Sequence, residues 1–270
     1  MADHSIALRN VSYRLPNGRS LLAGLNLSIS RGETLILLGR SGSGKTTSLK
    51  LINRLLESSE GEILIEGRPQ SQWDLIRLRR SIGYVIQDAG LFPHWTVDRN
   101  VGLVPRLEGW PEARVRERVQ QMLALVGLDA AEFAQRFPHE LSGGQRQRVG
   151  VARALAADPP ILLMDEPFGA LDPVTRAELQ REFRGLAARL GKTIAFVTHD
   201  LREALLLGTR IALLSAGRLA GVYSPKEFLR ASEPEARAFV ESIDSGTVGD
   251  TCSADDAAAP PTVPNSGGDL

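Results

Sequence analysis

The sequence is poor in the features that mark several large classes of protein. Its 270 residues contain one cysteine, Cys252, so no disulfide can form within the chain, and the composition fits a reducing compartment. No apolar run approaches the roughly 18 residues that cross a bilayer. The N-terminal segment MADHSIALRN also lacks the basic and apolar blocks of a signal peptide. We therefore expect a cytosolic protein whose role at a membrane, if any, comes through partners.

Neither sign of charge is in excess. Lys and Arg together number 32, and Asp and Glu together also number 32. A dedicated nucleic-acid-binding protein usually carries a surplus of basic residues, so we expect no nucleic-acid partner. Hydrophobic residues make up 43% of the chain, which is enough for a packed core.

Short apolar segments alternate with amphipathic ones through most of the chain. Several apolar segments are continuous, as in the strands of a parallel sheet that is covered on both faces. Helical patterns lie between them, so the sequence predicts an α/β fold with a mainly parallel sheet. The expected strands are 34–39, 62–67, 82–87, 161–166, 193–199 and 210–215, and the expected helices are 46–58, 173–191 and 200–208.

Three regions depart from this alternation. The N-terminal stretch, with its turn at Asn17 and Gly18, predicts an antiparallel β layer. Residues 88–158 contain helical patterns at 111–128 and 145–157 without strands between them, which predicts a helical subdomain inserted in the core. Residues 244–270 are rich in Ser, Gly, Asp and Pro, the composition of a disordered tail, which leaves 1–243 as the folded domain.

A glycine-rich loop, GRSGSGKT at 39–46, satisfies the pattern G-x-x-x-x-G-K-[ST] between an expected strand and an expected helix. Its glycines allow the backbone amides to approach phosphates, and Lys45 is placed to contact the β- and γ-phosphates. Lysine occurs at only three other positions, Lys50, Lys192 and Lys226, so its presence here indicates a chemical requirement. The predicted ATP-binding residues are Gly39, Arg40, Ser41, Gly42, Ser43, Gly44, Lys45, Thr46 and Thr47.

Polar residues end or follow the expected strands, where ligands bind in open α/β sheets. Asp165 and Glu166 end ILLMDE: Asp165 is predicted to hold Mg²⁺ together with Thr46, and Glu166 to orient or deprotonate the attacking water. Gln87 ends IGYVIQ and can reach Mg²⁺ or the water. His199 ends TIAFVTH, where it can contact the γ-phosphate. The predicted catalytic residues are thus Glu166, His199 and Gln87, and the predicted metal-binding residues are Thr46, Gln87 and Asp165.

A second anion-binding helix start is predicted in the segment SGGQ at 142–145. Ser142 is expected to cap the helix, and Gly143 and Gly144 leave its first amides uncovered ahead of Gln145. The loop at 39–46 already encloses the phosphates of one nucleotide, and the helical insert separates the two loops. We therefore expect two chains in a head-to-tail pair, each supplying 142–145 to the γ-phosphate held by the other.

Taken together, these motifs resemble the ATPase subunit of an ABC transporter over residues 5–240. The resemblance rests on GRSGSGKT, Gln87, LSGGQ at 141–145, ILLMD followed by Glu166, ALD at 170–172, and His199. It implies a dimer, most simply of two copies, that closes on ATP and opens after hydrolysis. It also implies a membrane permease, a periplasmic or extracellular substrate-binding protein, and a peripheral location at the cytoplasmic face of the plasma membrane. Asp172 can cap the helix that starts at Pro173 or contact the second subunit.

Some segments resemble one branch of the ABC family, and one position departs from the pattern of the family. The sequences of three segments, 49–55, 82–97 and 148–173, resemble those of importers of quaternary amines such as glycine betaine, choline or carnitine. The aromatic that stacks on adenine in the family is replaced by Leu15, so either Leu15 or Tyr13 could touch the base. Phe92, Trp95 and apolar residues within 101–107 could receive a permease helix or simply pack the insert. Residues 218–240 resemble the helical ending of importer ATPases.

Three other functions remain open from the sequence. The same ATPase could power a different importer or a lipid or drug exporter. A regulatory subunit that binds ATP without hydrolysis is disfavoured by the presence of Glu166 and His199. An ABC ATPase acting on nucleic acid or the ribosome typically fuses two ATPase units or inserts long coiled coils, and neither is present in the sequence.

Overall fold

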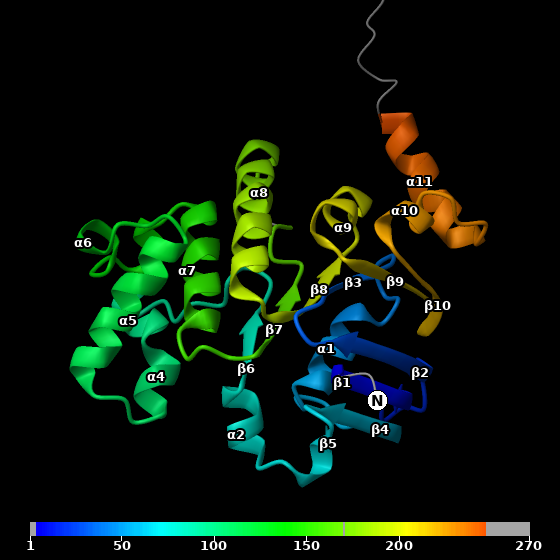
Figure 1. Cartoon of the computed structure of the whole chain (residues 1–270), viewed down its shortest axis with the longest axis horizontal. Coiled ribbons are helices and arrows are strands. Elements are labelled where there is room, and N and C mark those ends of the chain that lie inside the picture. Colours follow the sequence, from blue (N-terminus) through cyan, green and yellow to red (C-terminus); the bar gives the residue numbers. More distant parts are fainter. Residues whose placement is uncertain (1–3, 170, 247–270) are drawn as a thin grey trace, which may run out of the picture.

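The chain folds into two β-sheets and a set of helices in a computed structural model that describes residues 4–169 and 171–246 (Figure 1). The predicted α/β class is confirmed. The strands are β1 (His4–Arg14), β2 (Ser20–Ser30), β3 (Thr34–Leu38), β4 (Glu60–Ile65), β5 (Arg68–Pro69), β6 (Ile82–Val85), β7 (Ile161–Asp165), β8 (Thr193–Thr198), β9 (Arg210–Ser215) and β10 (Arg218–Tyr223). The helices are α1 (Lys45–Ile52), α2 (Leu75–Arg80), α3 (Val97–Val101), α4 (Leu103–Leu107), α5 (Glu112–Leu125), α6 (Ala130–Phe133), α7 (Gly143–Leu155), α8 (Pro173–Leu190), α9 (Leu201–Leu207), α10 (Pro225–Phe228) and α11 (Pro234–Gly246), with short 3-10 turns at Gln70–Gln72 and Pro138–Glu140.

The smaller sheet is antiparallel and has the strand order β2-β1-β4-β5. Its first hairpin turns at Asn17 and Gly18, where Gly18 has a φ of 83° that favours glycine. The predicted antiparallel layer is therefore confirmed. The strand expected at 62–67 is β4, which pairs with β1 and so belongs to this sheet.

The larger sheet has the order β10-β9-β3-β8-β7-β6 and is parallel except for β10, which pairs antiparallel with β9. Alternate residues of its central strands enter different cores. Leu35 and Leu37 of β3 join the core shared with the smaller sheet, whereas Ile36 and Leu38 join the core beneath the helices. The sheet is thus covered on both faces, which explains the continuously apolar strands.

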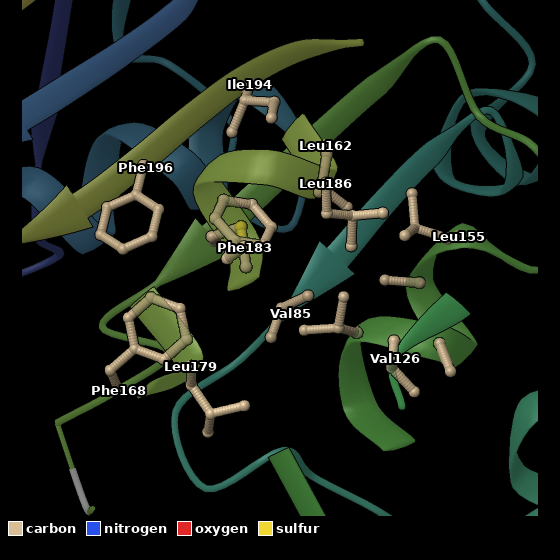
Figure 2. Close-up of a cluster of buried hydrophobic side chains, with 14 of the residues drawn as sticks. Val85, Val126, Leu155, Leu162, Phe168, Leu179, Phe183, Leu186, Ile194 and Phe196 are labelled. Carbon is tan, nitrogen blue, oxygen red and sulfur yellow. The ribbon is translucent and has the colours of Figure 1, made fainter. Parts of the chain in front are cut away.

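Helix α8 is fixed on the helical face of the sheet by aromatic packing. Figure 2 shows Phe183 and Leu186 of α8 against Leu162 and Ile194 of the strands. The ring of Phe183 lies 6.1 Å from that of Phe168 and 6.3 Å from that of Phe196, between ring centroids. In Figure 1, α8 stands between the helices of the insert and α9, and it contacts both α7 and α9.

The helical insert lies between β6 and β7, where α3 to α7 follow one another without an intervening strand in this fully described stretch. Elsewhere the observed helices differ from the expected ones. Helix α1 ends at Ile52, well before 58, and the chain turns at Arg54 with a left-handed φ of 50°. The expectation of a helical ending at 218–240 is wrong for its first part, because Arg218–Tyr223 extends the sheet as β10.

The C-terminal helix α11 continues to Gly246, past the expected end of the folded domain at 243. The rest of the predicted tail, with Cys252, lies outside the described residues. Within 4–169 and 171–246, no helix combines the length and the apolar character that a bilayer crossing requires.

Candidate nucleotide-binding site

The phosphate loop joins the end of β3 to the start of α1, as the sequence predicts. At two of its positions only glycine fits, because a Cβ atom would clash with neighbouring residues. A Cβ on Gly39 would lie 2.3 Å from the Leu214 carbonyl oxygen, and one on Gly44 would lie 2.5 Å from Leu22 Cδ2. Gly44 also has a φ of 101°, which side chains other than glycine rarely adopt. The loop backbone therefore fits closely against β2 and β9.

Lys45 lies buried inside this loop. Its Nζ donates hydrogen bonds to the carbonyl oxygens of Gly39 at 2.7 Å and Arg40 at 2.9 Å. Burial lowers the pKa of Lys45, while the nearby charges of Glu166 and Asp165 act in the opposite direction. The ammonium group is thus enclosed by the loop and faces two carboxylates.

Asp165, at the end of β7, connects the sheet to the phosphate loop. Its Oδ1 accepts a hydrogen bond of 2.8 Å from Thr46 Oγ1. Burial raises the pKa of Asp165, since its side chain sits among apolar strands. A carboxylate and a hydroxyl are both hard oxygen donors, which suit Mg²⁺ when phosphates and waters complete its shell. Among the described residues no cluster of three His, Cys, Asp or Glu side chains is placed to hold a metal, so a site here would depend on this pair and the bound phosphates.

Tyr84 also contacts Asp165, and sequence reasoning missed it. It lies on β6, beside β7, and its hydroxyl is near the Asp165 carboxylate. Burial raises the pKa of Tyr84 above its ordinary value, and the Asp165 charge adds to the effect. A tyrosine within an otherwise apolar strand was the available signal.

Glu166 and His199 meet at the ends of neighbouring strands. His199 Nδ1 and Glu166 Oε2 are 3.1 Å apart. Glu166 has a left-handed φ of 45°, which is rare outside glycine, and its amide donates to the Val197 carbonyl oxygen at 3.1 Å. Strain of this kind is concentrated at functional sites. The turn after β7 thus directs Glu166 toward the residue that follows β8.

A pocket of about 440 Å³ opens beside this pair and is lined by Arg40, Ser41, Glu166, His199 and Phe239. Phe239 comes from α11, and so does Glu235, which forms a 2.7 Å ion pair with Arg40 of the phosphate loop. No motif in the sequence indicates that the C-terminal helix borders the site. Its contribution depends on a tertiary contact between residues 195 positions apart.

Gln87 is further from the strand than predicted. Strand β6 ends at Val85, and Gln87 is exposed in the turn that follows it. The expectation that Gln87 ends the strand is therefore wrong, because the chain leaves the sheet after Val85 and enters the insert.

The two candidate adenine contacts lie at the end of β1. The strand ends at Arg14, so Tyr13 is its penultimate residue and Leu15 lies beyond it. Both are half-buried, and Tyr13 packs partly against the core of the smaller sheet. Their role toward a base stays a prediction.

The second glycine segment starts α7, and the predicted cap at Ser142 is confirmed. Ser142 Oγ accepts from the Gln145 amide at 3.2 Å, and Gln145 Oε1 accepts from the Ser142 amide at 2.9 Å. Ser142 and Gly143 are exposed, whereas Gly144 is buried against α8, where an added Cβ would lie 2.7 Å from Thr175 Cγ2. Gly144 is therefore needed for packing.

Asp172 caps α8, which is the first of the two roles predicted for it. Its Oδ1 accepts from the Thr175 amide at 3.0 Å, and the backbone and side-chain hydrogen bonds from Thr175 lower the pKa of Asp172. Ala170, in the same ALD segment, lies outside the described residues.

A phosphate loop between a parallel strand and a helix, with an acidic pair ending another strand of the sheet, defines a P-loop nucleotide-binding protein. Within that class the chain belongs to the ABC transporter family, whose sequence profile matches residues 22–169. The "Choline transport ATP-binding protein OpuBA" of Bacillus subtilis (strain 168) is 51% identical over 236 residues, which are 87% of this chain and 61% of that protein. The "Osmoprotectant import ATP-binding protein OsmV" of Salmonella typhimurium is 52% identical over 205 residues, or 76% of this chain and 54% of that protein. The chain thus spans less than two thirds of the length of these relatives.

Solved structures show the same fold. The ATP-binding cassette MJ0796, in a dimeric post-hydrolysis state bound to ADP and Pi, has a TM-score of 0.73 and 36% identity, covering 82% of this chain and 98% of that one. The cbiO1 protein from Clostridium perfringens, part of the ABC transporter complex cbiONQ, has a TM-score of 0.78 and 30% identity, covering 91% of this chain and 98% of that one.

Proposed function

We propose that this chain is the ATP-hydrolysing subunit of an ABC importer for a quaternary amine such as glycine betaine, choline or carnitine. The observation that carries the hydrolytic part is the 3.1 Å contact between Glu166 and His199 beside the phosphate loop. The names of OpuBA and OsmV, a choline transport protein and an osmoprotectant import protein, support the solute class. An ATPase subunit does not touch the transported molecule, so the proposed solute class is supported by these relatives and not by the residues of the site.

The proposed binding step uses the loop 39–47. Its amides and Lys45 hold the phosphates, and Tyr13 or Leu15 contacts the base. Thr46 and Asp165 would hold Mg²⁺, with Gln87 reaching it or the water from its exposed turn. Mg²⁺ bound there would offset the negative charge of the phosphates.

In the proposed chemical step Glu166 orients or deprotonates water for attack on the γ-phosphate. His199 restrains the Glu166 carboxylate through its Nδ1 atom and presents its other ring nitrogen to the phosphate. The His199 side chain is 61% exposed, so a phosphate in the pocket can approach it. Glu166 is more enclosed, with 25% of its side chain exposed.

Two chains are proposed to close head to tail on two ATP molecules. Ser142 and Gly143 at the start of α7 are exposed, with their capping geometry already formed, and can meet the γ-phosphate of a second chain. Asp172, which is exposed at the start of α8, would also face the partner. The dimeric state of the similar cassette MJ0796 supports this arrangement. ATP then favours the closed dimer, and hydrolysis favours the open one.

The insert is proposed to receive a membrane permease, which would make the subunit peripheral to the cytoplasmic face of the plasma membrane. Phe92 and Leu107 are 39% and 53% exposed, and the Phe92 and Trp95 rings lie 4.5 Å apart. Val101, a further candidate, is fully buried and belongs to the core of the insert. A substrate-binding protein would join through the permease, and no nucleic acid is involved.

Solute-stimulated ATPase measurements on the chain co-purified with its native permease and binding protein test the proposal. Glycine betaine, choline or carnitine should raise the rate, whereas sulfate should not. Stimulation by a lipid or drug alone would favour export. No hydrolysis with any solute would contradict the ATPase assignment itself.

A further inference from the structure

A buried carboxylate lies four residues after the histidine of the site in the sequence. Glu203 of α9 is 5% exposed. It accepts a hydrogen bond from Thr198 Oγ1 at 2.5 Å and another from Gln180 Nε2 at 2.8 Å. A buried charged group is costly unless it is hydrogen-bonded, so these two contacts are the ones that allow Glu203 to occupy this position.

Thr198 is the last residue of β8 and directly precedes His199. Its hydroxyl has one proton, which it donates to Glu203, and its oxygen accepts the Asp200 amide at 2.9 Å. The residues on both sides of His199 are therefore held by a single hydroxyl, whose direction is fixed by the Glu203 carboxylate. The His199 ring itself is 61% exposed, so packing restrains it little, and its direction depends on the backbone of this turn and on the contact with Glu166.

At its other oxygen Glu203 is tied to α8. Gln180 lies on the helix that Phe183 anchors to the sheet, in the aromatic packing visible in Figure 2. One turn earlier on α8, Arg176 donates to the carbonyl oxygens of Gly169 at 3.2 Å and Leu171 at 3.0 Å. Glu203 thus connects the turn that contains His199 to α8. Through Arg176, the first turns of the same helix also hold the segment that follows Glu166.

We propose that Glu203 is a positioning residue for ATP hydrolysis. Through Thr198 it holds the turn at 198–200, so that His199 Nδ1 stays at hydrogen-bond distance from Glu166. The inference rests on the proposed hydrolytic function and extends it to a residue outside the pocket. If Glu203 only stabilised α9, its loss would lower stability and leave the catalytic rate of the folded protein unchanged.

Steady-state ATPase kinetics of the full chain, with its permease where needed, separate these two roles. Glu203→Leu removes both hydrogen bonds, and we expect kcat to fall on the order of tenfold to a hundredfold while KM for ATP stays within about twofold. Glu203→Gln can rebuild both bonds if the Gln180 amide turns over, and it should recover most of kcat. Leu207→Ala is the matched control, because Leu207 is buried on α9 outside this network. It should lower the urea midpoint without lowering kcat.

A double-mutant cycle then asks whether Glu203 acts through His199. In a His199→Ala background, Glu203→Leu should cause no further loss of single-turnover rate. A full additional loss would overturn the proposal. Thr198→Val removes the same hydroxyl contact while keeping the side-chain shape, so it should reproduce the kcat loss. It replaces Glu203→Leu in the experiment if that variant does not fold.

Two negative results have different meanings. If the wild-type protein hydrolyses ATP and both Glu203→Leu and Thr198→Val retain the wild-type kcat, only the role of Glu203 is overturned. A wild type without hydrolysis would overturn the proposed function as well.

Discussion

Thr46 and Asp165 are joined by a 2.8 Å hydrogen bond that connects the phosphate loop to the end of β7. If these two oxygens bind Mg²⁺, Thr46→Ala should raise the Mg²⁺ concentration needed for half-maximal ATPase activity. Thr46→Ser keeps the hydroxyl and should keep the wild-type requirement. An unchanged Mg²⁺ titration curve for Thr46→Ala would remove Thr46 from the metal site.

Glu166→Gln should retain MgATP binding and slow turnover by orders of magnitude, because an amide cannot take the proton of the attacking water. The variant should accumulate as an ATP-bound dimer in light scattering. Glu57→Gln is a suitable control, since the Glu57 side chain is 79% exposed and far from Glu166 in the sequence. Turnover near the wild-type rate in Glu166→Gln would contradict the role of Glu166.

Lys45→Ala should weaken nucleotide binding itself, because the buried ammonium group is the cation enclosed by the phosphate loop. Isothermal titration with a non-hydrolysable ATP analogue measures the effect. Lys192→Ala removes a lysine that pairs with Asp158 and should leave the affinity unchanged. Equal affinities for Lys45→Ala and the wild type would show that Lys45 does not hold phosphate.

Gly144→Ala should destabilise the fold, whereas Gly143→Ala should not. An added Cβ meets Thr175 Cγ2 at 2.7 Å at Gly144 but finds its nearest neighbour, Leu171 Cδ2, at 3.6 Å at Gly143. Overpacking of this kind costs about 1–3 kcal/mol. Chemical unfolding measures the free energy of unfolding of each variant. Equal free energies for Gly144→Ala and Gly143→Ala would mean that α7 and α8 can move apart to accommodate the added Cβ.

The parts of the site that the sequence predicts are those with local causes. The loop at 39–46 and the caps at Ser142 and Asp172 depend on residues within a few positions of one another. The placement of Asp165, Glu166 and His199 at one edge follows from strands that run parallel.

The features that the sequence did not predict depend on distant partners. Tyr84 meets Asp165 only because β6 pairs with β7, and Glu235 meets Arg40 only because α11 packs beside the phosphate loop. The three consecutive apolar residues of β4, at 63–65, fit a strand of either sheet, and pairing with β1 places them in the smaller one. Glu203 looks like an ordinary helical glutamate until its burial is known.

We propose above that each ATP is held between two chains, by the phosphate loop of one and the 142–145 segment of the other. Mixed dimers of Lys45→Ala and Ser142→Arg test it most directly, because both changes fall in one composite site and leave the second site intact. Each variant alone should be inactive, and the mixture should regain up to about half of the wild-type ATPase rate per mixed dimer. A mixture as inactive as its two components would contradict the shared site.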